Sequence, residues 1–584
     1  MVPLPPSPAL SWTGSIWKLR DADPERVARI AASTRLGPVA ARCLALRWDG
    51  EGMPDADWLT PTLAALHDPG RMHGMDAAVA RLERAIANHE RVRIITDYDV
   101  DGTTSSLILQ AALRLRAPDL EIDYHIPNRF DEGYGFSVKA AEKAVADGIG
   151  LIVTADIGVR DHLAVDAAVA GGTDVLICDH HLPAGADVPP NALVLCPPQA
   201  ACAYPNPSLA ACGVSLKLAS ALLAKHPKLD RILDSLLKLA AIGTVADLVP
   251  LTTPENRAIV ALGLQQLNKG GHHAGLAALL EVCRMDGPIS ESDLGFRVGP
   301  RINAAGRLQD ARMVVELLNT RDPARAKALA HELDTLNSER RTIQKQVYEE
   351  AIGQVDPEAP APFVVVSGPE EAGWHRGVVG IVASKVKDAV HRPTAVVSIQ
   401  GDTAVGSIRS IDSVHAVRAL DSAADLLVKY GGHPAAAGFT VPTAKLPALA
   451  ERLGAFVEAH TEPADLVRQR RVDAEASAED LTWQLHAELA ALGPFGMGNP
   501  RPRLMVRGVT PVAPGSRAGG KLLKFLIGRG GGGAVSAIWW GEGERAESFG
   551  ARPVDLLGQL GTNTYRGETT LQFEVNDVRD ATPD

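Results

Sequence analysis

Short apolar runs alternate with helix-like segments along the middle of the chain, from Val92 onward. The runs are VRIIT, EIDYHIP, GLIVTADIG, DVLICDHH and ALVLCPP, and the segments between them place apolar residues at helical spacing. This alternation predicts an α/β domain with a mostly parallel sheet and crossover helices. In such sheets, binding sites form at the carboxyl ends of the strands.

The flanking regions have other patterns. Residues 1–85 are expected to be mostly helical, as is the helical pattern MDAAVARLERAIANHE at their end (residues 75–90). A long charged helix is expected before the linker DPEAPAP, a second α/β segment after it, and strand-like pieces such as LLKFLIG, AVSAIWW and TLQFEV near the end. We therefore divide the chain into a helical region (1–85), an α/β domain (86–315), a connecting helix (316–356), a second α/β domain (357–460) and a small β domain (465–584).

Length and composition limit the class of protein. The chain has 584 residues, which suggests several domains, and 46% hydrophobic residues, enough for sizeable cores. We expect no signal peptide or membrane span, and six cysteines without a CxxC pair suggest reduced thiols in a cytoplasmic protein. The net charge of -11 argues against a protein that coats nucleic acid, but not against a nucleic-acid enzyme.

The stretch TDYDVDG follows the first strand and carries Asp97, Asp99 and Asp101 at alternate positions. Three carboxylates on one side of an extended chain repel each other unless a cation lies between them. An EF-hand loop is disfavoured because its twelfth position would be Ile108 and because a strand precedes it. A solvated acidic turn explains one aspartate better than three.

Other strand ends carry similar side chains. LIVTADIG ends in Asp156, VLICDHH ends in Asp179, His180 and His181, and Asp247 follows a helix in LAAIGTVADLVPL. Each residue alone could be a cap, a turn former or a buried histidine, but together they bring potential metal ligands to one sheet edge. Carboxylates with one or two imidazoles suit Mn²⁺ or Mg²⁺. Their number predicts two ions and hydrolysis of a phosphoester.

The motifs DYDVDG, TADIG, DHH and GTVADLVPL, in this order, resemble those of the DHH phosphoesterase family. The resemblance implies that Asp99 and Asp101 bind metals, Asp156 bridges them, and His180 and Asp247 complete the second site. It further implies that Asp97 binds a metal or supports a ligand, Asp179 orients a ligand, and His181 faces the phosphate. Some relatives have an upstream histidine where this chain has Ile94, Ile95 and Thr96, so Asp97 is a candidate substitute.

Further motifs resemble the RecJ group of this family: PNRFDEGYG, GPRINAAGRL, GWHRGVVGIVASKV, GSIRS, GGHPAAAGF and LGPFGMGNPRP. The implied fold is a DHH-type parallel-sheet domain and a DHH-associated α/β domain joined by a long helix, with a C-terminal OB-like β domain. The implied activity is 5′→3′ exonuclease action on single-stranded DNA, giving mononucleotides, in DNA repair and recombination. The implied partners are single-stranded-DNA-binding protein and a RecQ-type helicase, and we expect a monomer without membrane contact.

The glycine-rich motifs also carry candidate phosphate ligands. Backbone N–H groups in such segments can approach phosphates closely, and Ser407 with Arg409 could hold a terminal phosphate. A surface salt bridge remains the alternative for any single arginine. The other predicted substrate residues are Arg129, Arg301, Asn303, Arg307, His375, Arg376 and His433.

The stretch 489–541 contains seven basic residues and no acidic one: Arg501, Arg503, Arg507, Arg517, Lys521, Lys524 and Arg529. With Phe495, Phe525, Trp539 and Trp540, it predicts an OB-fold surface that binds single strands by charge and base stacking. Neighbouring strand residues face opposite ways, so at least one of the two tryptophans is expected in the core.

Two other functions are weighed against the exonuclease. A DHH phosphodiesterase for short oligoribonucleotides or cyclic dinucleotides would lack the long basic C-terminal region. A non-catalytic DHH scaffold would have lost the metal-binding aspartates, which are intact here.

Overall fold

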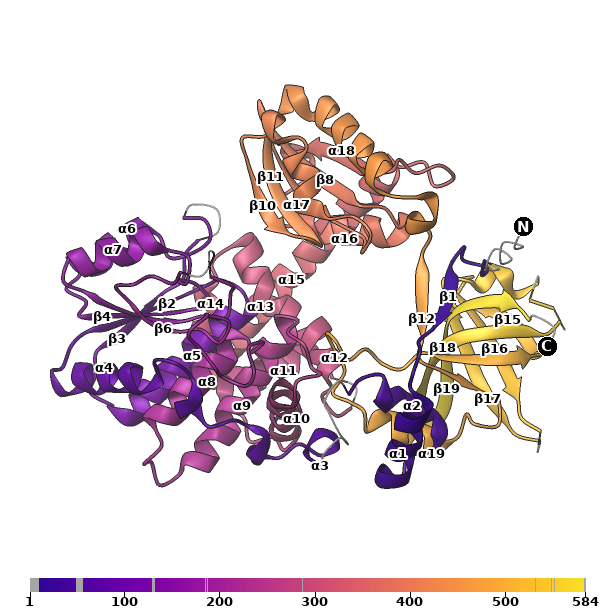
Figure 1. Ribbon diagram of the computed structural model, residues 1–584, viewed down its shortest axis with the longest axis horizontal. Coiled ribbons are helices and arrows are strands. Elements are labelled where there is room, and N and C mark those ends of the chain that lie inside the picture. Colours follow the sequence, from indigo (N-terminus) through magenta and orange to yellow (C-terminus); the bar gives the residue numbers. More distant parts are fainter. Residues whose placement is uncertain are drawn as a thin grey trace.

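The computed structural model describes residues 10–48, 56–128, 132–183, 185, 187–285, 287–530, 532–547, 549–550 and 552–581. Three bodies are visible in Figure 1: an α/β domain with attached helices, a second α/β domain, and a β domain. The helix α15 leads from the first body to the second, and the strand β12 leads from the second to the third.

The first body contains a parallel sheet with strand order β3-β2-β4-β5-β6. Its strands are β2 (Val92–Thr96), β3 (Ile122–His125), β4 (Leu151–Ala155), β5 (Asp174–Cys178) and β6 (Leu193–Leu195). One face packs on α4 (Met75–Ala87), α5 (Val100–Arg116) and α8 (Ala211–Leu222), and the other on α6 (Val138–Ala146) and α7 (His162–Ala170). Burial on both faces explains the continuous apolar runs, and the predicted parallel sheet is confirmed.

Helices continue from this sheet toward the rest of the chain. They are α9 (Leu229–Ala246), α10 (Pro254–Asn268), α11 (Ala274–Cys283), α12 (Glu291–Asp293), a π-helix (Leu294–Val298), α13 (Gly299–Leu308) and α14 (Arg312–Asn319). The long helix α15 (Pro323–Ile352) begins later than expected because Thr320 leaves the helical conformation and Asp322 caps a new helix. Pro323 occupies the first helical position, where its missing N–H is not needed.

The second α/β domain has the strand order β10-β11-β9-β8-β7. Its elements are β7 (Val364–Pro369), α16 (Val379–Val390), β8 (Thr394–Gln400), β9 (Thr403–Arg409), α17 (Ala416–Asp421), β10 (Lys429–His433), β11 (Ala436–Pro442) and α18 (Leu446–His460). The last turns of α15 pack here, since Val347 and Ala351 share a core with Val379 and Val396.

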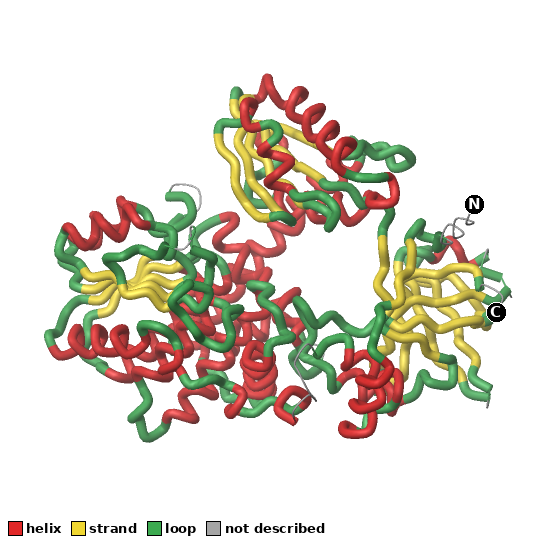
Figure 2. Tube along the Cα trace, in the orientation of Figure 1, coloured by secondary structure: helices red, strands yellow, loops and turns green. Residues whose placement is uncertain are grey.

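The third body is a β domain with the strand order β13-β14-β18-β19-β17-β16-β15. Its strands, yellow like all strands in Figure 2, lie near the C-terminus in that view. Its elements are β12 (Gln469–Val472), β13 (Ala474–Ala476), α19 (Trp483–Ala490), β14 (Leu504–Val509), β15 (Pro511–Arg517), β16 (Leu522–Gly528), β17 (Ala534–Trp540), β18 (Val554–Tyr565) and β19 (Glu568–Asp580). The three strand-like pieces expected from the sequence lie in β16, β17 and β19.

Helices α1 (Pro24–Thr34), α2 (Pro38–Ala45) and α4 make up much of the described part of residues 1–85, as expected, but they do not pack together as one region. The strand β1 (Ile16–Leu19) pairs in parallel with β12, and α1 and α2 pack on the β domain. Ile30 and Leu44 share a core with Phe525 and Phe573, and Trp58 of the short α3 (Ala56–Leu59) belongs to the same core. The apolar faces of α1 and α2 find their partner more than 400 residues away, which local periodicity does not reveal.

The structure bears on the expected absence of a membrane span and on the state of the cysteines. Within the described ranges, no helix is both long and apolar enough to cross a membrane. All six cysteines are free thiols, as their spacing suggested.

Candidate active site

The carboxyl ends of β2, β4 and β5 meet at one edge of the parallel sheet, because these strands are neighbours. Asp97 and Asp99 follow β2, Asp156 follows β4, and the DHH residues 179–181 follow β5. Asp247, at the end of α9, joins them. The predicted meeting of these motifs is therefore confirmed.

The side chains form three adjacent groups, and within each group the potential ligand atoms lie within 4.8 Å of one another. Asp156 belongs to two of these groups, and its Oδ1 lies 3.2 Å from Nε2 of His180, whose Nδ1 lies 3.6 Å from Oδ2 of Asp247. The three groups are Asp97, Asp99 and Asp156; Asp101, His180 and Asp247; and Asp156, His180 and His181.

The first turn of α5 holds the aspartates of the first motif in place. The N–H of Gly102 donates to Asp99 Oδ1 at 3.0 Å, so Asp99 caps the helix. A Cβ on Gly102 would lie 2.4 Å from the carbonyl oxygen of Asp97. Only glycine therefore allows the helix to start this close to the strand end.

Asp101 and Asp156 are fixed by backbone contacts. The N–H groups of Ala211 and Cys212, at the start of α8, donate to the two oxygens of Asp101 at 2.7 and 2.9 Å. Asp156 has a left-handed backbone with φ 65°, and its N–H donates to the Cys178 carbonyl at 3.0 Å. Aspartate is among the few residues that adopt this conformation readily.

Asp179 contacts both histidines of the DHH motif. Its Oδ1 accepts from the N–H groups of His180 and His181 and lies 2.8 Å from His181 Nδ1, and its Oδ2 accepts from Val159 N–H. The other ring nitrogen of His181 lies 3.2 Å from the Tyr134 hydroxyl. Sequence reasoning missed Tyr134, although FDEGYG lay among the motifs of the resemblance.

Burial and mutual repulsion disfavour the charged forms of the aspartates. Burial, followed by neighbouring carboxylates, raises the pKa of Asp156 well above its usual range and that of Asp247 to about 9. Burial also raises the pKa of Asp101 and lowers that of His180. A cation among these groups would stabilise the charged carboxylates and so lower their pKa values.

Asp179 and His181 behave in the opposite way. Burial raises the pKa of Asp179, but the hydrogen bond and charge of His181 outweigh it and lower the pKa to about 2. Burial lowers the pKa of His181, and Asp179 outweighs it and raises the pKa above the usual range. The pair therefore favours a carboxylate beside an imidazolium.

The residues fit a divalent metal. His180 Nε2 is buried and makes no hydrogen bond to any described residue, so it can act as a ligand. The surrounding donors are carboxylate oxygens, which suit Mn²⁺ or Mg²⁺ better than a structural zinc. Asp97, Asp99, Asp101, Asp156, His180 and Asp247 would hold the ions.

A second cluster lies on the second α/β domain. Arg409 donates to Ser407 Oγ at 2.9 Å, and a Cβ on Gly380, in the first turn of α16, would lie 3.0 Å from Arg409 Nη2. Arg409 is largely buried, which lowers its pKa, and has no acidic partner among the described residues. A cation beside a helix N-terminus without a carboxylate suits an anion.

The strands next to this cluster leave its face open. Gly438 lies opposite Ser407 and Gly431 lies opposite Gly438, and neither position has a side chain or a close neighbour where one would be. His433 lies across Ala436 from Arg409 on the same face, about 10 Å away at two strand spacings. The glycines of GSIRS and GGHPAAAGF thus expose backbone beside the arginine.

The helix α13 joins the two clusters. Arg307 donates to the Gly377 carbonyl at 3.0 Å, just before α16, and His375 Nδ1 accepts from Gly377 N–H. A Cβ on the preceding Gly306 would lie 2.9 Å from the carbonyl oxygen of Tyr98, which stands between Asp97 and Asp99. The motif GPRINAAGRL therefore contacts the metal motif on one side and the phosphate-site loop on the other.

The remaining predicted substrate residues lie in different settings. Asn303 is half-buried on α13, one turn before Arg307, and Arg376 is exposed beside Gly377. Arg301 pairs with Asp334 of α15 at 2.8 Å and donates to two backbone carbonyls. Arg129 lies outside the described residues.

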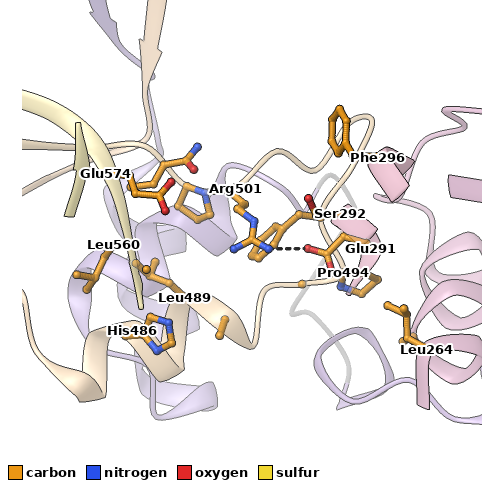
Figure 3. Close-up of a pocket in the computed structure, with 17 residues that line it drawn as sticks. Leu264, Glu291, Ser292, Phe296, His486, Leu489, Pro494, Arg501, Leu560 and Glu574 are labelled. Atoms are coloured by element: carbon orange, nitrogen blue, oxygen red, sulfur yellow. Dashed lines mark hydrogen bonds and ion pairs between the residues drawn. The ribbon is translucent and has the colours of Figure 1, made fainter. Parts of the chain in front are cut away.

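Two of the seven basic residues of the stretch 489–541 have acidic partners. Arg501 pairs with Glu291 at 3.1 Å (Figure 3), and Arg507 pairs with Glu475 at 2.5 Å. Both acids lie outside the stretch 489–541, so local counting missed them. Arg517, Lys521 and Lys524 remain exposed on the β domain.

The two tryptophans divide as expected, whereas Phe525, a candidate for base stacking, is buried. Phe525 and Trp539 lie in the core, whereas Trp540 is 64% exposed. Phe495 is half-buried, with the Arg501 guanidinium 5.3 Å from its ring centroid. Trp540 is therefore the aromatic residue of this set best placed to meet a base.

Family models match three parts of the chain. The DHH family N-terminal domain matches residues 91–244, the DHHA1 domain matches residues 361–459, and the RecJ OB domain matches residues 472–577. The matches follow the three bodies of the fold in order.

Curated relatives and solved structures extend over nearly the whole chain. The single-stranded-DNA-specific exonuclease RecJ of Dickeya dadantii is 34% identical, with 94% of this chain and 97% of the relative covered. The RecJ of Bacillus subtilis is also 34% identical, over 96% of this chain and 70% of the relative. The crystal structure of Thermus thermophilus RecJ in complex with Mn²⁺ matches with a TM-score of 0.81 and 32% identity, over 97% of this chain and 80% of that one. The chain therefore belongs to the RecJ family of single-stranded-DNA-specific exonucleases.

Proposed function

We propose that the protein is a Mn²⁺- or Mg²⁺-dependent exonuclease that degrades single-stranded DNA from the 5′ end to mononucleotides. The observation that carries this proposal is the gathering of five aspartates and His180 into adjacent ligand groups, two of which share Asp156. The names of the relatives support the substrate, and the Mn²⁺ and Mg²⁺ complexes of Thermus thermophilus RecJ support the metals.

The protein's own residues have distinct tasks in this reaction. Asp156, held by its left-handed backbone, would be shared between two ions. His181, charged through its contact with Asp179, complements the scissile phosphate. When bound, the ions supply Lewis-acid chemistry that neutralises phosphate charge and lowers the pKa of the attacking water.

The second cluster supports the proposed polarity of degradation. Arg409 and Ser407 offer a cation and a hydroxyl beside the start of α16, a suitable pocket for a terminal phosphate. We infer that the 5′-phosphate binds there while the next phosphodiester lies at the metal-binding edge. The contact of Arg307 with Gly377 keeps the two clusters in one unit.

The activity is tested with single and double strands of DNA and RNA, labelled at either end, with Mn²⁺ and with Mg²⁺. We expect 5′-labelled mononucleotides from single-stranded DNA at the earliest times. Release from the 3′ end, or equal attack on duplexes, would contradict the proposal.

The phosphate pocket is tested by Arg409→Gln. The wild type should cut a 5′-phosphorylated strand faster than a 5′-hydroxyl strand, and the variant should lose most of that difference. A charge-assisted contact of about 1.5–3 kcal/mol corresponds to roughly 10–100-fold in kcat/KM. Arg418→Gln, at an exposed position of α17, is the control. Equal loss on both substrates would assign Arg409 to general binding instead.

We further infer a cytoplasmic monomer that acts in DNA repair and recombination on strands opened by a RecQ-type helicase and covered by single-stranded-DNA-binding protein. Single-stranded DNA as the substrate of the relatives supports this setting. Light scattering tests the monomer, and degradation of a duplex only when the helicase is present tests the coupling.

A further inference from the structure

A pocket of about 480 Å³ lies where the second α/β domain meets the β domain. Its lining comes from the end of α16, from β1 and from β12, which Figure 1 shows side by side at this junction. Ser410 and Ser413, which directly follow the GSIR segment of β9, also line it. We refer to it as the junction pocket.

Basic side chains dominate the lining: Lys18, Lys387, His391, Arg468, Arg471 and Arg503. Asp388, Asp412 and Asp465 are the acidic residues of the lining, and Arg470 also contributes. Arg470 is neutralised by the buried Asp577 at 3.1 Å, and Lys387 by Asp388 at 2.8 Å. Arg471 lies 4.0 Å from Asp412, but both side chains are highly exposed, so this pair is weak.

Arg503 is a partly buried cation of this lining without an ion pair among the described residues. Its guanidinium has no hydrogen bond or ion pair with a described residue, although the side chain is partly buried. Burial lowers the pKa of Arg503, and the positive charge of Arg470 lowers it further. The adjacent Asp473 carboxylate is already shared by Arg20 and Arg47. An anion in the pocket would relieve this unfavourable state.

We propose that the junction pocket binds backbone phosphates of the single strand, at a site separate from the Arg409 cluster. This inference rests on the proposed function. Arg409 contacts the first turn of α16, whereas Lys387 and His391 lie near its other end, about 17 Å away along a 12-residue helix. A strand must therefore extend beyond its terminal nucleotide to reach the pocket.

The geometry favours phosphate over other anions. A guanidinium presents a planar fork that matches phosphate oxygens, and Lys18 adds a point charge on the neighbouring strand β1. Residues 410–413, which line the pocket, come directly after Ser407 and Arg409 of the terminal-phosphate cluster. Both sites can therefore bind the same DNA strand. The same chemistry would accept a free nucleotide, which the experiment separates from a strand.

The test replaces Lys18, Arg471 and Arg503 together with glutamine in the full chain. Binding of a long labelled oligothymidylate is measured without metal between about 50 and 200 mM NaCl. Each lost phosphate contact should lower the slope of log K against log [NaCl] by about 0.7, so the triple variant should lose about 2. Replacing Arg325, Lys327 and Lys345, which are exposed on or beside α15, removes the same charge and should leave the slope unchanged.

Three results would overturn the proposal. First, the triple variant is folded, as measured by circular dichroism, and keeps the wild-type salt slope. Second, the triple variant loses binding of thymidine monophosphate but keeps the wild-type salt slope, which would assign the pocket to a free nucleotide. Third, an acidic peptide competes for the pocket but the strand does not, which would assign the pocket to a protein partner. Failure of the wild type to hydrolyse single-stranded DNA would contradict the proposed function instead.

Discussion

At the scale of single residues, the candidate active site depends on carboxylates that are unfavourable without metal. Asp156 is buried, has a left-handed backbone and belongs to two ligand groups. Asp101 and Asp247 are buried or nearly so, and burial raises the pKa of each. The burial and the raised pKa values follow from three strand ends that meet at one edge of the sheet. Metal ions and protons therefore compete for these carboxylates.

Asp156→Asn should abolish hydrolysis while the protein stays folded. Asparagine tolerates the left-handed conformation but removes the charge shared by both ligand groups. We expect a loss of at least about 10²–10³-fold in kcat, the scale of losing one preorganised electrostatic contact. Steady-state kinetics and metal content measure it. Wild-type turnover with unchanged metal content would refute sharing of Asp156.

Binding of Mn²⁺ should release protons. Below pH 9 the Asp247 carboxyl, with its pKa of about 9, holds a proton in the metal-free protein, and the metal must displace it. The apparent affinity should therefore rise with pH up to about 9. Calorimetry in buffers of different ionisation enthalpy counts the protons, and Asp247→Asn should lower the count. A pH-independent affinity would exclude this competition.

At the scale of elements, α13 is the connection that the proposed reaction needs. Its Gly306 packs on Tyr98 in the metal motif, and its Arg307 bonds to Gly377 before α16. Neither contact involves a metal ligand, yet together they fix the distance between the metal-binding edge and the terminal-phosphate cluster.

Gly306→Ala should therefore lower kcat and stability together. The new Cβ would lie 2.9 Å from the Tyr98 carbonyl oxygen, and overpacking of this kind costs about 1–3 kcal/mol. Gly454→Ala, within α18, has no atom within 4 Å of the new Cβ and should leave activity unchanged and stability equal or higher. Thermal unfolding and kinetics compare the two. Normal activity of Gly306→Ala would show that α13 does not position the site.

The elements differ in how far sequence alone could predict them. Strand ends with Asp97, Asp156 and His180 were predictable because a parallel sheet brings neighbouring carboxyl ends together. The ion pairs of Arg301 with Asp334 and of Arg501 with Glu291 were not, because their partners lie 33 and 210 residues away. The bridging role of α13 was hidden for the same reason, since it depends on tertiary packing.

At the scale of the whole molecule, both ends of the chain build one domain. Residues 10–48 supply β1, α1 and α2 to the β domain, and Arg47 joins them to it. Arg47 is almost fully buried, pairs with Asp473 at 3.2 Å and donates to the Pro500 carbonyl at 2.8 Å.

Arg47→Met should destabilise the β domain by about 3–5 kcal/mol, because it leaves the buried Asp473 with a weaker partner. Hydrogen exchange of β14 and β18 should accelerate accordingly. Arg29→Met removes an exposed pair with Glu25 and should change exchange little. Equal exchange in both variants would mean that the N-terminal segment adds little to the domain.

The pairing of β1 with β12 also has a consequence in time. A ribosome must add about 450 residues after β1 before β12 exists, which takes roughly 25–90 s at typical elongation rates. Throughout this interval the apolar faces of α1 and α2 have no native partner, while the first α/β domain can already fold. The nascent chain thus carries an open hydrophobic segment at its front, a natural substrate for a chaperone that binds early and releases late.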